Sequence, residues 1–169
     1  MDKNIVLIGM MGSGKTTVGK LVAGCLRRPF VDTDALIEER EGRSIPDIFE
    51  QDGEDAFRAL ELKLSQELSG QHGLVVACGG GLPAQAEAIH ALKQNGLVFW
   101  LDRDPVETYG GLNVSHRPLA RSGREDFIRR YQDRAPVYRR WADYLIPCGD
   151  GPDAAEQLIS TIYLEVYRK

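Results

Sequence analysis

The stretch GMMGSGKT at residues 9–16 matches the pattern G-x-x-x-x-G-K-[ST] of a phosphate-binding loop. The glycines let the backbone curl so that successive N–H groups face one anion, and the helix that follows adds its positive dipole end. By this chemistry Lys15 reaches the outer phosphates of a nucleotide and the Thr16 hydroxyl ligates Mg²⁺. A plain tight turn is the alternative, and a chance match in this composition is on the order of one in two hundred. We predict a nucleotide site at Gly12, Ser13, Gly14, Lys15, Thr16 and Thr17.

Short apolar runs alternate with helical periodicity on both sides of this loop. The runs at residues 4–8, 29–31, 73–77, 97–101 and 144–147 predict strands. Residues 110–123 lack periodicity and are expected to form a loop. Helices are predicted at residues 15–26, 33–41, 45–51, 54–69, 83–94, 124–141 and 153–167, with Pro83 in a first turn and Pro136 kinking or breaking its helix. This alternation is typical of an α/β fold with a parallel sheet covered by helices on both faces.

Length and charge limit the possible functions. A chain of 169 residues predicts a single domain, residues 1–169. The formal net charge of −4 argues against nucleic acid or anionic membrane as partners, so an anion site must be built locally. No apolar run approaches the ~20 residues of a membrane span. The first residues lead into a strand without the pattern of a signal peptide, and we therefore expect a cytoplasmic protein.

Two acidic residues follow the second predicted strand. A phosphate-loop site needs a carboxylate near Mg²⁺, and Asp32 at the tip of an apolar strand is well placed to supply it, through a water molecule. Asp34 lies two residues further along, where it could face the hydroxyl group of an acceptor. The alternative is that Asp32 or Thr33 caps the next helix.

Further motifs follow in a set order: GMMGSGKTT at 9–17, DTD at 32–34, FR at 57–58, GGG at 79–81, RPL at 117–119 and RAPVYRR at 134–140. Together they give a chain that resembles shikimate kinases over nearly its whole length. The resemblance implies a three-layer α/β/α P-loop NTPase fold with a five-stranded parallel sheet. It also implies an acceptor-binding region at about residues 32–62 and a mobile lid at about residues 111–124.

The resemblance assigns roles on the acceptor side. Asp34 matches the acid that contacts the acceptor hydroxyl, and Arg58 and Arg134 match the pair that holds the shikimate carboxylate. Gly80 and Gly81 match the backbone that approaches the ring hydroxyls. The residue types suit these roles, because an arginine fork fits a planar carboxylate and glycines admit close approach of a ligand.

On the nucleotide side, Arg117 matches the lid arginine that reaches the transferring phosphate, and Pro152 lies in the segment that matches the adenine loop. Many lids of the family carry another arginine shortly before this one, but residues 107–116 contain none. Residues 149–152 likewise lack a basic side chain. With Thr16 and Asp32 as metal ligands, the predicted catalytic set is Lys15, Asp34 and Arg117.

The implied reaction is shikimate + ATP to shikimate 3-phosphate + ADP, in aromatic amino acid biosynthesis. ATP is the co-substrate, Mg²⁺ the cofactor, and the expected assembly is a monomer. Two alternatives remain open. One is a kinase of the same fold with another acceptor, such as gluconate or a nucleoside monophosphate. The other is a nucleotide-binding regulatory module without transfer activity, against which the set Lys15, Asp32, Asp34 and Arg117 argues.

Overall fold

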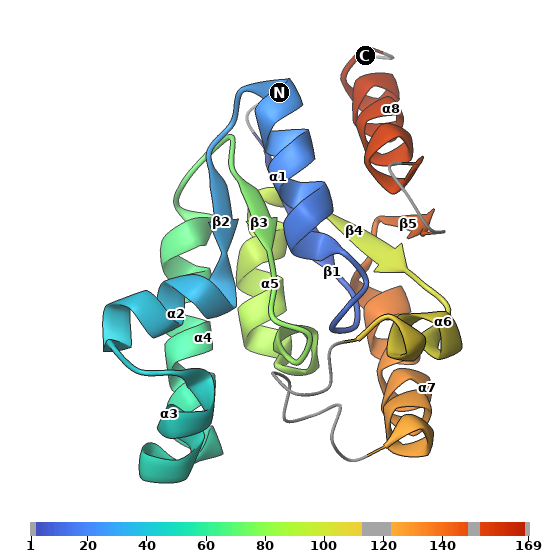
Figure 1. Ribbon diagram of the computed structural model, residues 1–169. Coiled ribbons are helices and arrows are strands. Elements are labelled where there is room, and N and C mark those ends of the chain that lie inside the picture. Colours follow the sequence, from blue (N-terminus) through green and yellow to red (C-terminus); the bar gives the residue numbers. More distant parts are fainter. Residues whose placement is uncertain (1–2, 113–122, 149–152, 168–169) are drawn as a thin grey trace.

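The glycine loop at residues 9–14 connects a buried strand to a helix, as the sequence predicts (Figure 1). The computed structural model describes residues 3–112, 123–148 and 153–167. Its first half contains β1 (Asn4–Ile8), α1 (Lys15–Leu26), β2 (Phe30–Asp32), α2 (Thr33–Glu41), α3 (Ile45–Asp52), α4 (Glu54–Ser69) and β3 (Val75–Ala77). Its second half contains the 3₁₀ helix η1 (Leu82–Ala84), α5 (Ala86–Gln94), β4 (Gly96–Asp102), α6 (Pro105–Gly110), α7 (Arg124–Trp141), β5 (Tyr144–Pro147) and α8 (Asp153–Tyr167).

The five strands form one parallel sheet in the order β2-β3-β1-β4-β5. In the central strand, Ile5 pairs with Val75 of β3 on one side and with Leu97 of β4 on the other. Because the strands are parallel, their carboxyl ends lie along one edge of the sheet, and ligands of such sheets bind outside that edge. The glycine loop after β1, Asp32 at the end of β2 and the glycines after β3 therefore lie at the same edge.

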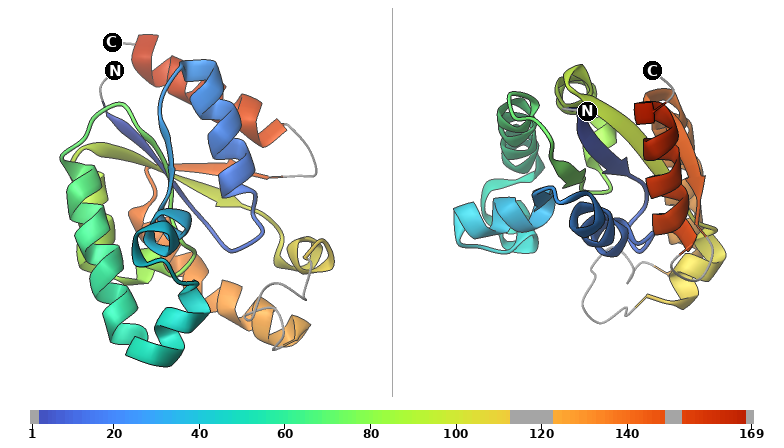
Figure 2. Two further views of the ribbon diagram at one scale, coloured as in Figure 1. Left: turned by 60° about the vertical axis from the view of Figure 1, so that its left-hand side comes forward. Right: turned by 90° about the horizontal axis from the view of Figure 1, so that it is seen from above.

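Helices cover both faces of the sheet, which confirms the predicted three-layer architecture (Figure 2). Alternate residues of β1 point to opposite faces, so a strand buried on both sides is apolar throughout. Ile5 and Leu7 pack with α1 and α8 on one face. Val6 and Ile8 pack on the other face with residues of α2, α3, α4, α5 and α7.

At the amino end of β1, the Asn4 side chain ties three backbone groups together. Its Nδ2 atom donates to the carbonyls of Leu68 at 3.2 Å and Gln71 at 2.9 Å, and its Oδ1 atom accepts from the N–H of Leu74 at 2.9 Å. Asn4 is fully buried, so each of these bonds satisfies a polar group that water does not reach. The end of the sheet opposite to the glycine loop is thereby closed.

Two prolines behave differently from the prediction. Helix α7 runs unbroken through Pro136, because buried side chains on both sides of it, Phe127 and Tyr138, anchor the helix in the core. Pro83 does not begin the long helix but lies in the short helix η1. The extended backbone of Gln85, with φ −90° and ψ 95°, separates η1 from α5.

Helix α6 is absent from the prediction. Its start carries a signal that a closer reading could use: the Asp104 carboxylate accepts from the N–H groups of Val106 and Glu107 at 2.8 and 3.1 Å, and Pro105 follows it in the first turn. The helix is only six residues long and buries one of them, Thr108, so hydrophobic periodicity cannot reveal it.

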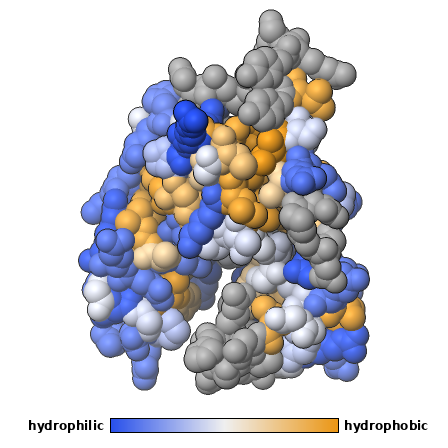
Figure 3. All heavy atoms as spheres, turned by 45° about the horizontal axis from the view of Figure 1, so that its top comes forward, coloured by the Kyte–Doolittle hydropathy of each residue, from blue (hydrophilic) through white to orange (hydrophobic). Residues whose placement is uncertain are grey.

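The surface is hollowed between the part over α2–α4 and the part over α6 and α7, as Figure 3 shows. This hollow lies outside the carboxyl edge of the sheet, on the side where a ligand is expected. Among the described helices, none is both long and apolar enough to cross a lipid bilayer.

Candidate active site

The glycine loop adopts the backbone that a phosphate cradle requires. Gly12 and Gly14 have φ angles of 79° and 94°, in the left-handed region that side chains with a Cβ disfavour. Gly14 also begins α1, because its carbonyl accepts the N–H of Val18 at 2.8 Å. The first N–H groups of α1 therefore lie at the loop, where the helix dipole favours an anion.

Lys15 holds this loop closed from the inside. Its Nζ atom donates to the carbonyl oxygens of Gly9 at 2.9 Å and Met10 at 2.7 Å, and the residue is only 9% exposed. The same ammonium group is thus part of the loop's structure and lies inside the loop that is expected to bind phosphates. Its role at the outer phosphates stays a prediction.

Helix α6 supports the glycine loop from outside. A Cβ on Gly12 would lie 2.7 Å from a methyl carbon of Leu112 and 2.9 Å from the methyl carbon of Thr108. Thr108 is buried, and its hydroxyl donates to the Asp104 carbonyl at 2.7 Å, which fixes the methyl group toward the loop. The element that sequence reasoning missed is therefore packed directly on the predicted nucleotide site.

Asp32 serves two purposes at once. Its Oδ1 atom caps α2, accepting from the N–H groups of Asp34 at 3.1 Å and Ala35 at 3.2 Å, as the alternative reading proposed. Its Oδ2 atom accepts from the Thr16 hydroxyl at 2.7 Å. The two predicted metal ligands, on different elements, therefore meet at one point.

This pair of oxygens fits Mg²⁺, which binds few protein ligands and keeps several waters and phosphate oxygens. Within the described ranges, no three His, Cys, Asp or Glu side chains gather to form a closed metal site. The coordination of a cation at Thr16 and Asp32 would accordingly be completed by the nucleotide and water, as in other phosphate-loop sites.

Asp34 lies at the carboxyl edge of the sheet, at the start of α2, against Gly79 after β3. Burial, reinforced by the nearby charge of Asp32, raises the pKa of Asp34 to about 6, while Lys15 opposes the shift. Its Oδ1 atom is buried and has no hydrogen-bond partner among the described residues. A buried carboxylate oxygen with no partner is costly unless a ligand satisfies it, so Asp34 is available to bind a hydroxyl group.

Arg58 and Arg134 come together although they lie on different helices, α4 and α7. A Cβ on Gly81 would lie 3.0 and 3.1 Å from the two terminal nitrogens of Arg58, and 3.5 Å from a terminal nitrogen of Arg134. The Arg134 guanidinium also lies 3.5 Å from the corresponding position on Gly80. The predicted arginine pair and the predicted glycine backbone therefore form one continuous surface beside Asp34.

Sequence reasoning missed the acidic residues that hold Arg58. Glu61, one turn along α4, is 1% exposed and accepts from Arg58 at 2.5 Å, while Glu54 accepts from it at 3.1 and 3.3 Å. Burial raises the pKa of Glu61, and the Arg58 guanidinium opposes this shift. The Arg58 carbonyl in turn accepts from Gln85 at 3.0 Å. The spacing of three residues between Arg58 and Glu61 was the available signal.

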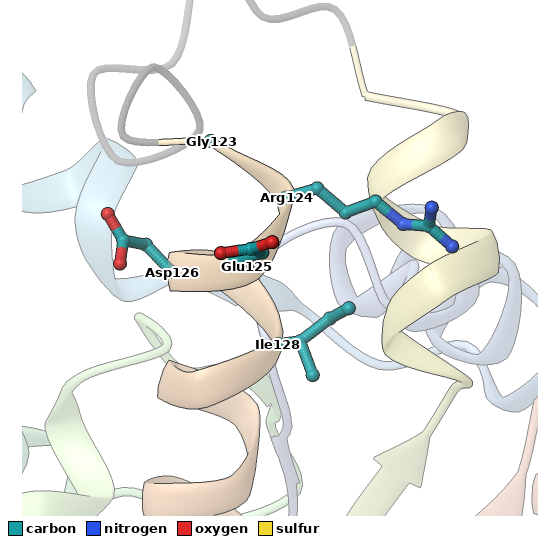
Figure 4. Close-up of a pocket in the computed structure, with 5 residues that line it drawn as sticks. All are labelled: Gly123, Arg124, Glu125, Asp126 and Ile128. Atoms are coloured by element: carbon teal, nitrogen blue, oxygen red, sulfur yellow. The ribbon is translucent and has the colours of Figure 1, made fainter.

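Two predicted site residues, Arg117 and Pro152, lie outside the described residues, as does most of the lid predicted at about 111–124. The end of that range is described, and there a shallow pocket lies at the start of α7 (Figure 4). Arg124 points from α7 across toward a neighbouring helix in this view. The pocket is lined by Gly123, Arg124, Glu125, Asp126 and Ile128, none of which belongs to the predicted site.

Comparison with known proteins gives consistent matches. The family model described as shikimate kinase matches residues 11–163. A shikimate kinase from Sulfurihydrogenibium sp. (strain YO3AOP1) is 48% identical over 138 residues, which cover 81% of this chain and 83% of the relative.

Solved structures agree with the sequence matches. A shikimate kinase from Acinetobacter baumannii, solved in complex with shikimate, superposes with a TM-score of 0.86 at 38% identity, covering 98% of this chain and 93% of the other. A shikimate kinase from Aquifex aeolicus superposes with a TM-score of 0.84 at 33% identity, covering 97% and 98% of the two chains.

Proposed function

This chain belongs to the shikimate kinase family of phosphotransferases, and on that premise we propose that its glycine-loop site transfers the γ-phosphoryl group of ATP to a ring hydroxyl of shikimate. The likeness in sequence and structure extends over most of the chain. The products of this reaction are shikimate 3-phosphate and ADP, in the pathway to aromatic amino acids.

One observation supports the acceptor more than any other: two arginines and one carboxylate converge at the edge of the sheet. Arg58 and Arg134 lie around Gly81, and Asp34 lies against Gly79. A pair of guanidinium groups suits a carboxylate, and a buried carboxylate with an unsatisfied oxygen suits a hydroxyl. This arrangement favours a hydroxylated carboxylic acid over a nucleoside monophosphate, whose phosphate would bring Asp34 close to a like charge.

Each described residue contributes a distinct part of the transfer. The glycine loop and Lys15 bind the phosphates, while Arg58 and Arg134 hold the acceptor by its carboxylate. Asp34 orients the attacking hydroxyl in line with the γ-phosphorus atom. The bond from this phosphorus to the bridging oxygen of ADP breaks as the bond to the hydroxyl oxygen forms, and the hydroxyl proton passes to Asp34 or to solvent. Because the transition state is loose, orientation contributes more than proton abstraction.

Mg²⁺ at Thr16 and Asp32, when bound, would neutralise charge on the β- and γ-phosphate oxygens. Arg117 belongs to this proposal as the lid cation at the transferring phosphate, and Pro152 as a contact of the adenine. We also propose that the enzyme is monomeric and acts in the cytoplasm.

The test is the release of ADP measured with shikimate, gluconate and a nucleoside monophosphate as separate acceptors. The proposal expects turnover with shikimate and a much smaller rate with the other two. Turnover with gluconate instead would reassign the acceptor, and ATP binding without ADP release in any mixture would indicate a regulatory module.

A further inference from the structure

Tyr138 lies beneath the acceptor site without facing the reaction. It is 1% exposed, on α7, and its hydroxyl donates to the carbonyl oxygen of Gly80 at 2.7 Å. The ring packs against Trp100 of β4, with the ring centres 5.9 Å apart, and the hydroxyl lies 3.6 Å from the sulfur of Met10. One side chain therefore contacts the glycines after β3 and the loop after β1.

Arg134 lies one helical turn before Tyr138 on α7, and a terminal nitrogen of its guanidinium lies 3.5 Å from where a Cβ on Gly80 would be. Burial raises the pKa of Tyr138 to about 12, although the charge of Arg134 opposes the shift. At neutral pH the hydroxyl therefore keeps its proton. It can therefore donate that proton to the Gly80 carbonyl.

The hydrogen bond from Tyr138 to the Gly80 carbonyl orients both this carbonyl and the N–H of Gly81. The peptide unit between Gly80 and Gly81 is planar and trans, so its N–H points to the side opposite its carbonyl. With the carbonyl held toward α7, the direction of the Gly81 N–H is fixed as well. Glycine has the widest choice of backbone conformations, so three consecutive glycines need an external contact to hold one of them.

We propose that Tyr138 is a positioning residue for acceptor binding, which holds the Gly80–Gly81 peptide, beside the Arg134 guanidinium, in the arrangement that shikimate meets. This inference rests on the proposed function and deepens it. The hydroxyl itself touches neither substrate. Its loss should weaken binding of the acceptor while the phosphate loop, held by Lys15, continues to bind ATP.

Helix α7 offers a matched control. Tyr131, nearly two turns before Tyr138, also lies on this helix, and its hydroxyl donates to Asp102 Oδ1 at 2.8 Å. Both tyrosines can be changed to phenylalanine with the loss of one oxygen atom. Only Tyr138 reaches the glycines of the acceptor site.

The experiment compares Tyr138→Phe and Tyr131→Phe with the parent enzyme, using steady-state kinetics, calorimetric binding of shikimate, and thermal unfolding. We expect Tyr138→Phe to raise KM and Kd for shikimate roughly tenfold, because a buried carbonyl loses its donor. KM for ATP and kcat should stay within about twofold of the parent values. Tyr131→Phe should leave the KM and Kd for shikimate unchanged, even if it lowers the melting temperature as much as Tyr138→Phe does.

Each outcome is informative. A Tyr138→Phe variant that binds shikimate as tightly as the parent would overturn the inference about Tyr138 but leave the proposed function standing. A variant whose KM rises equally for shikimate and ATP would do the same. A parent enzyme that phosphorylates gluconate and not shikimate overturns the proposed function, and the inference with it. Should the two variants differ in stability, the kinetics are measured at a temperature at which both are folded, so that loss of folded protein does not mimic loss of binding.

Discussion

The carboxylate of Asp34 lies where a side chain at position 79 would begin: a Cβ on Gly79 would stand 2.3 Å from Asp34 Oδ1. The Gly79 N–H is itself held by the Thr33 hydroxyl at 2.9 Å, on the residue next to Asp34. The Gly79 backbone therefore cannot move away from Asp34 without losing its hydrogen bond to Thr33. The absence of a side chain at position 79 thus defines where the acceptor-side carboxylate lies.

A Gly79→Ala variant should lose most of its turnover, because the new methyl group displaces Asp34 from the hydroxyl that it orients. A shift of about 1 Å at a reacting group costs on the order of 10² in rate, and overpacking costs about 1–3 kcal/mol of stability. Steady-state kinetics and thermal unfolding check both effects. The control is Gly24→Ala in α1, where a Cβ meets nothing within 4 Å and helix propensity improves. Parental kcat in Gly79→Ala would show that the position of Asp34 does not matter.

The pH dependence should follow the ionisation of Asp34. With its pKa raised to about 6, the carboxylate form that accepts a hydrogen bond from the substrate hydroxyl is lost as the pH falls through 6. The kcat/KM for shikimate should therefore rise with pH and level off above this value. A pH–rate profile of the parent checks it, and a flat profile between pH values of about 5 and 7 would contradict it.

Ionisation of Asp34 should lower the free energy of unfolding as the pH rises, although it raises activity. Its pKa in the folded protein lies above the ordinary value of 3.8, so the folded state binds more protons between these two values. Asp34 therefore costs stability as the pH rises from about 4 to about 6, on the order of 3 kcal/mol in full. Asp34→Asn should be more stable than the parent at pH 7.5 and should lose that advantage near pH 4. Urea unfolding at the two pH values measures the difference.

Lys15→Ala should abolish turnover while the protein stays folded. The change removes the ammonium group of the phosphate loop, and loss of one such charge at the transferring phosphate costs on the order of 10²–10³ or more in rate. It also removes two hydrogen bonds to the Gly9 and Met10 carbonyls, so a modest fall in melting temperature should accompany it. ADP release and circular dichroism test the two parts, and near-parental ADP release would remove Lys15 from the mechanism.

Asp32 and Asp34 should separate into a metal side and an acceptor side. Asp32→Asn is expected to raise the Mg²⁺ concentration needed for half-maximal activity, because a neutral amide is a poorer ligand for a hard cation than a carboxylate. Asp34→Asn should abolish transfer but leave ATP binding nearly unchanged. Mg²⁺ titrations and nucleotide binding by both variants decide between these roles. The assignment is wrong if Asp34→Asn loses nucleotide and Asp32→Asn loses only the acceptor.

Arg58 and Arg134 should act as one clamp. Each change to alanine should raise KM for shikimate by roughly 1.5–3 kcal/mol of binding free energy, with little change in KM for ATP. If both bind the same carboxylate, as proposed, the double variant should lose less than the sum of the two losses. A shikimate analogue with a carboxamide should be a poor substrate for the parent and be penalised little further in the variants. Strictly additive losses would show that the two side chains do not read one carboxylate.

Much of this site can be predicted from local sequence, because its groups lie at strand ends that short motifs mark. The glycine loop with Lys15 and Thr16 is one such motif, and the pair Asp32 and Asp34 is another. Local sequence patterns do not show which residues from distant segments meet in space. The meeting of Arg58 and Arg134 at Gly81 depends on how α4 and α7 pack on the sheet, and here a family resemblance supplied what local reasoning could not.

The two features that were missed share a physical cause. A glutamate on a helix is usually solvated, and only the packing of α4 against its neighbours buries Glu61 beside Arg58. Helix α6 fully buries only a threonine, against a glycine of the phosphate loop, and places just one aromatic side chain, Tyr109, on the core. Methods that follow hydrophobic periodicity detect neither arrangement, because each is a contact with the site and not with the core.

The hydrogen bonds of Asn4 have a consequence for engineering this enzyme. They lie at the end of β1 opposite to the glycine loop, far along the sheet from the desolvated Asp34. Variants selected for heat tolerance should therefore keep Asn4 itself, whose bonds satisfy buried backbone groups, and alter its neighbours, where no catalytic penalty is expected. Substitutions that relieve the strain of burying Asp34 would gain stability only by sacrificing rate. A directed-evolution library around the amino end of β1, with Asn4 retained, should yield robust catalysts, whereas one spread over the carboxyl edge should yield durable but inactive proteins.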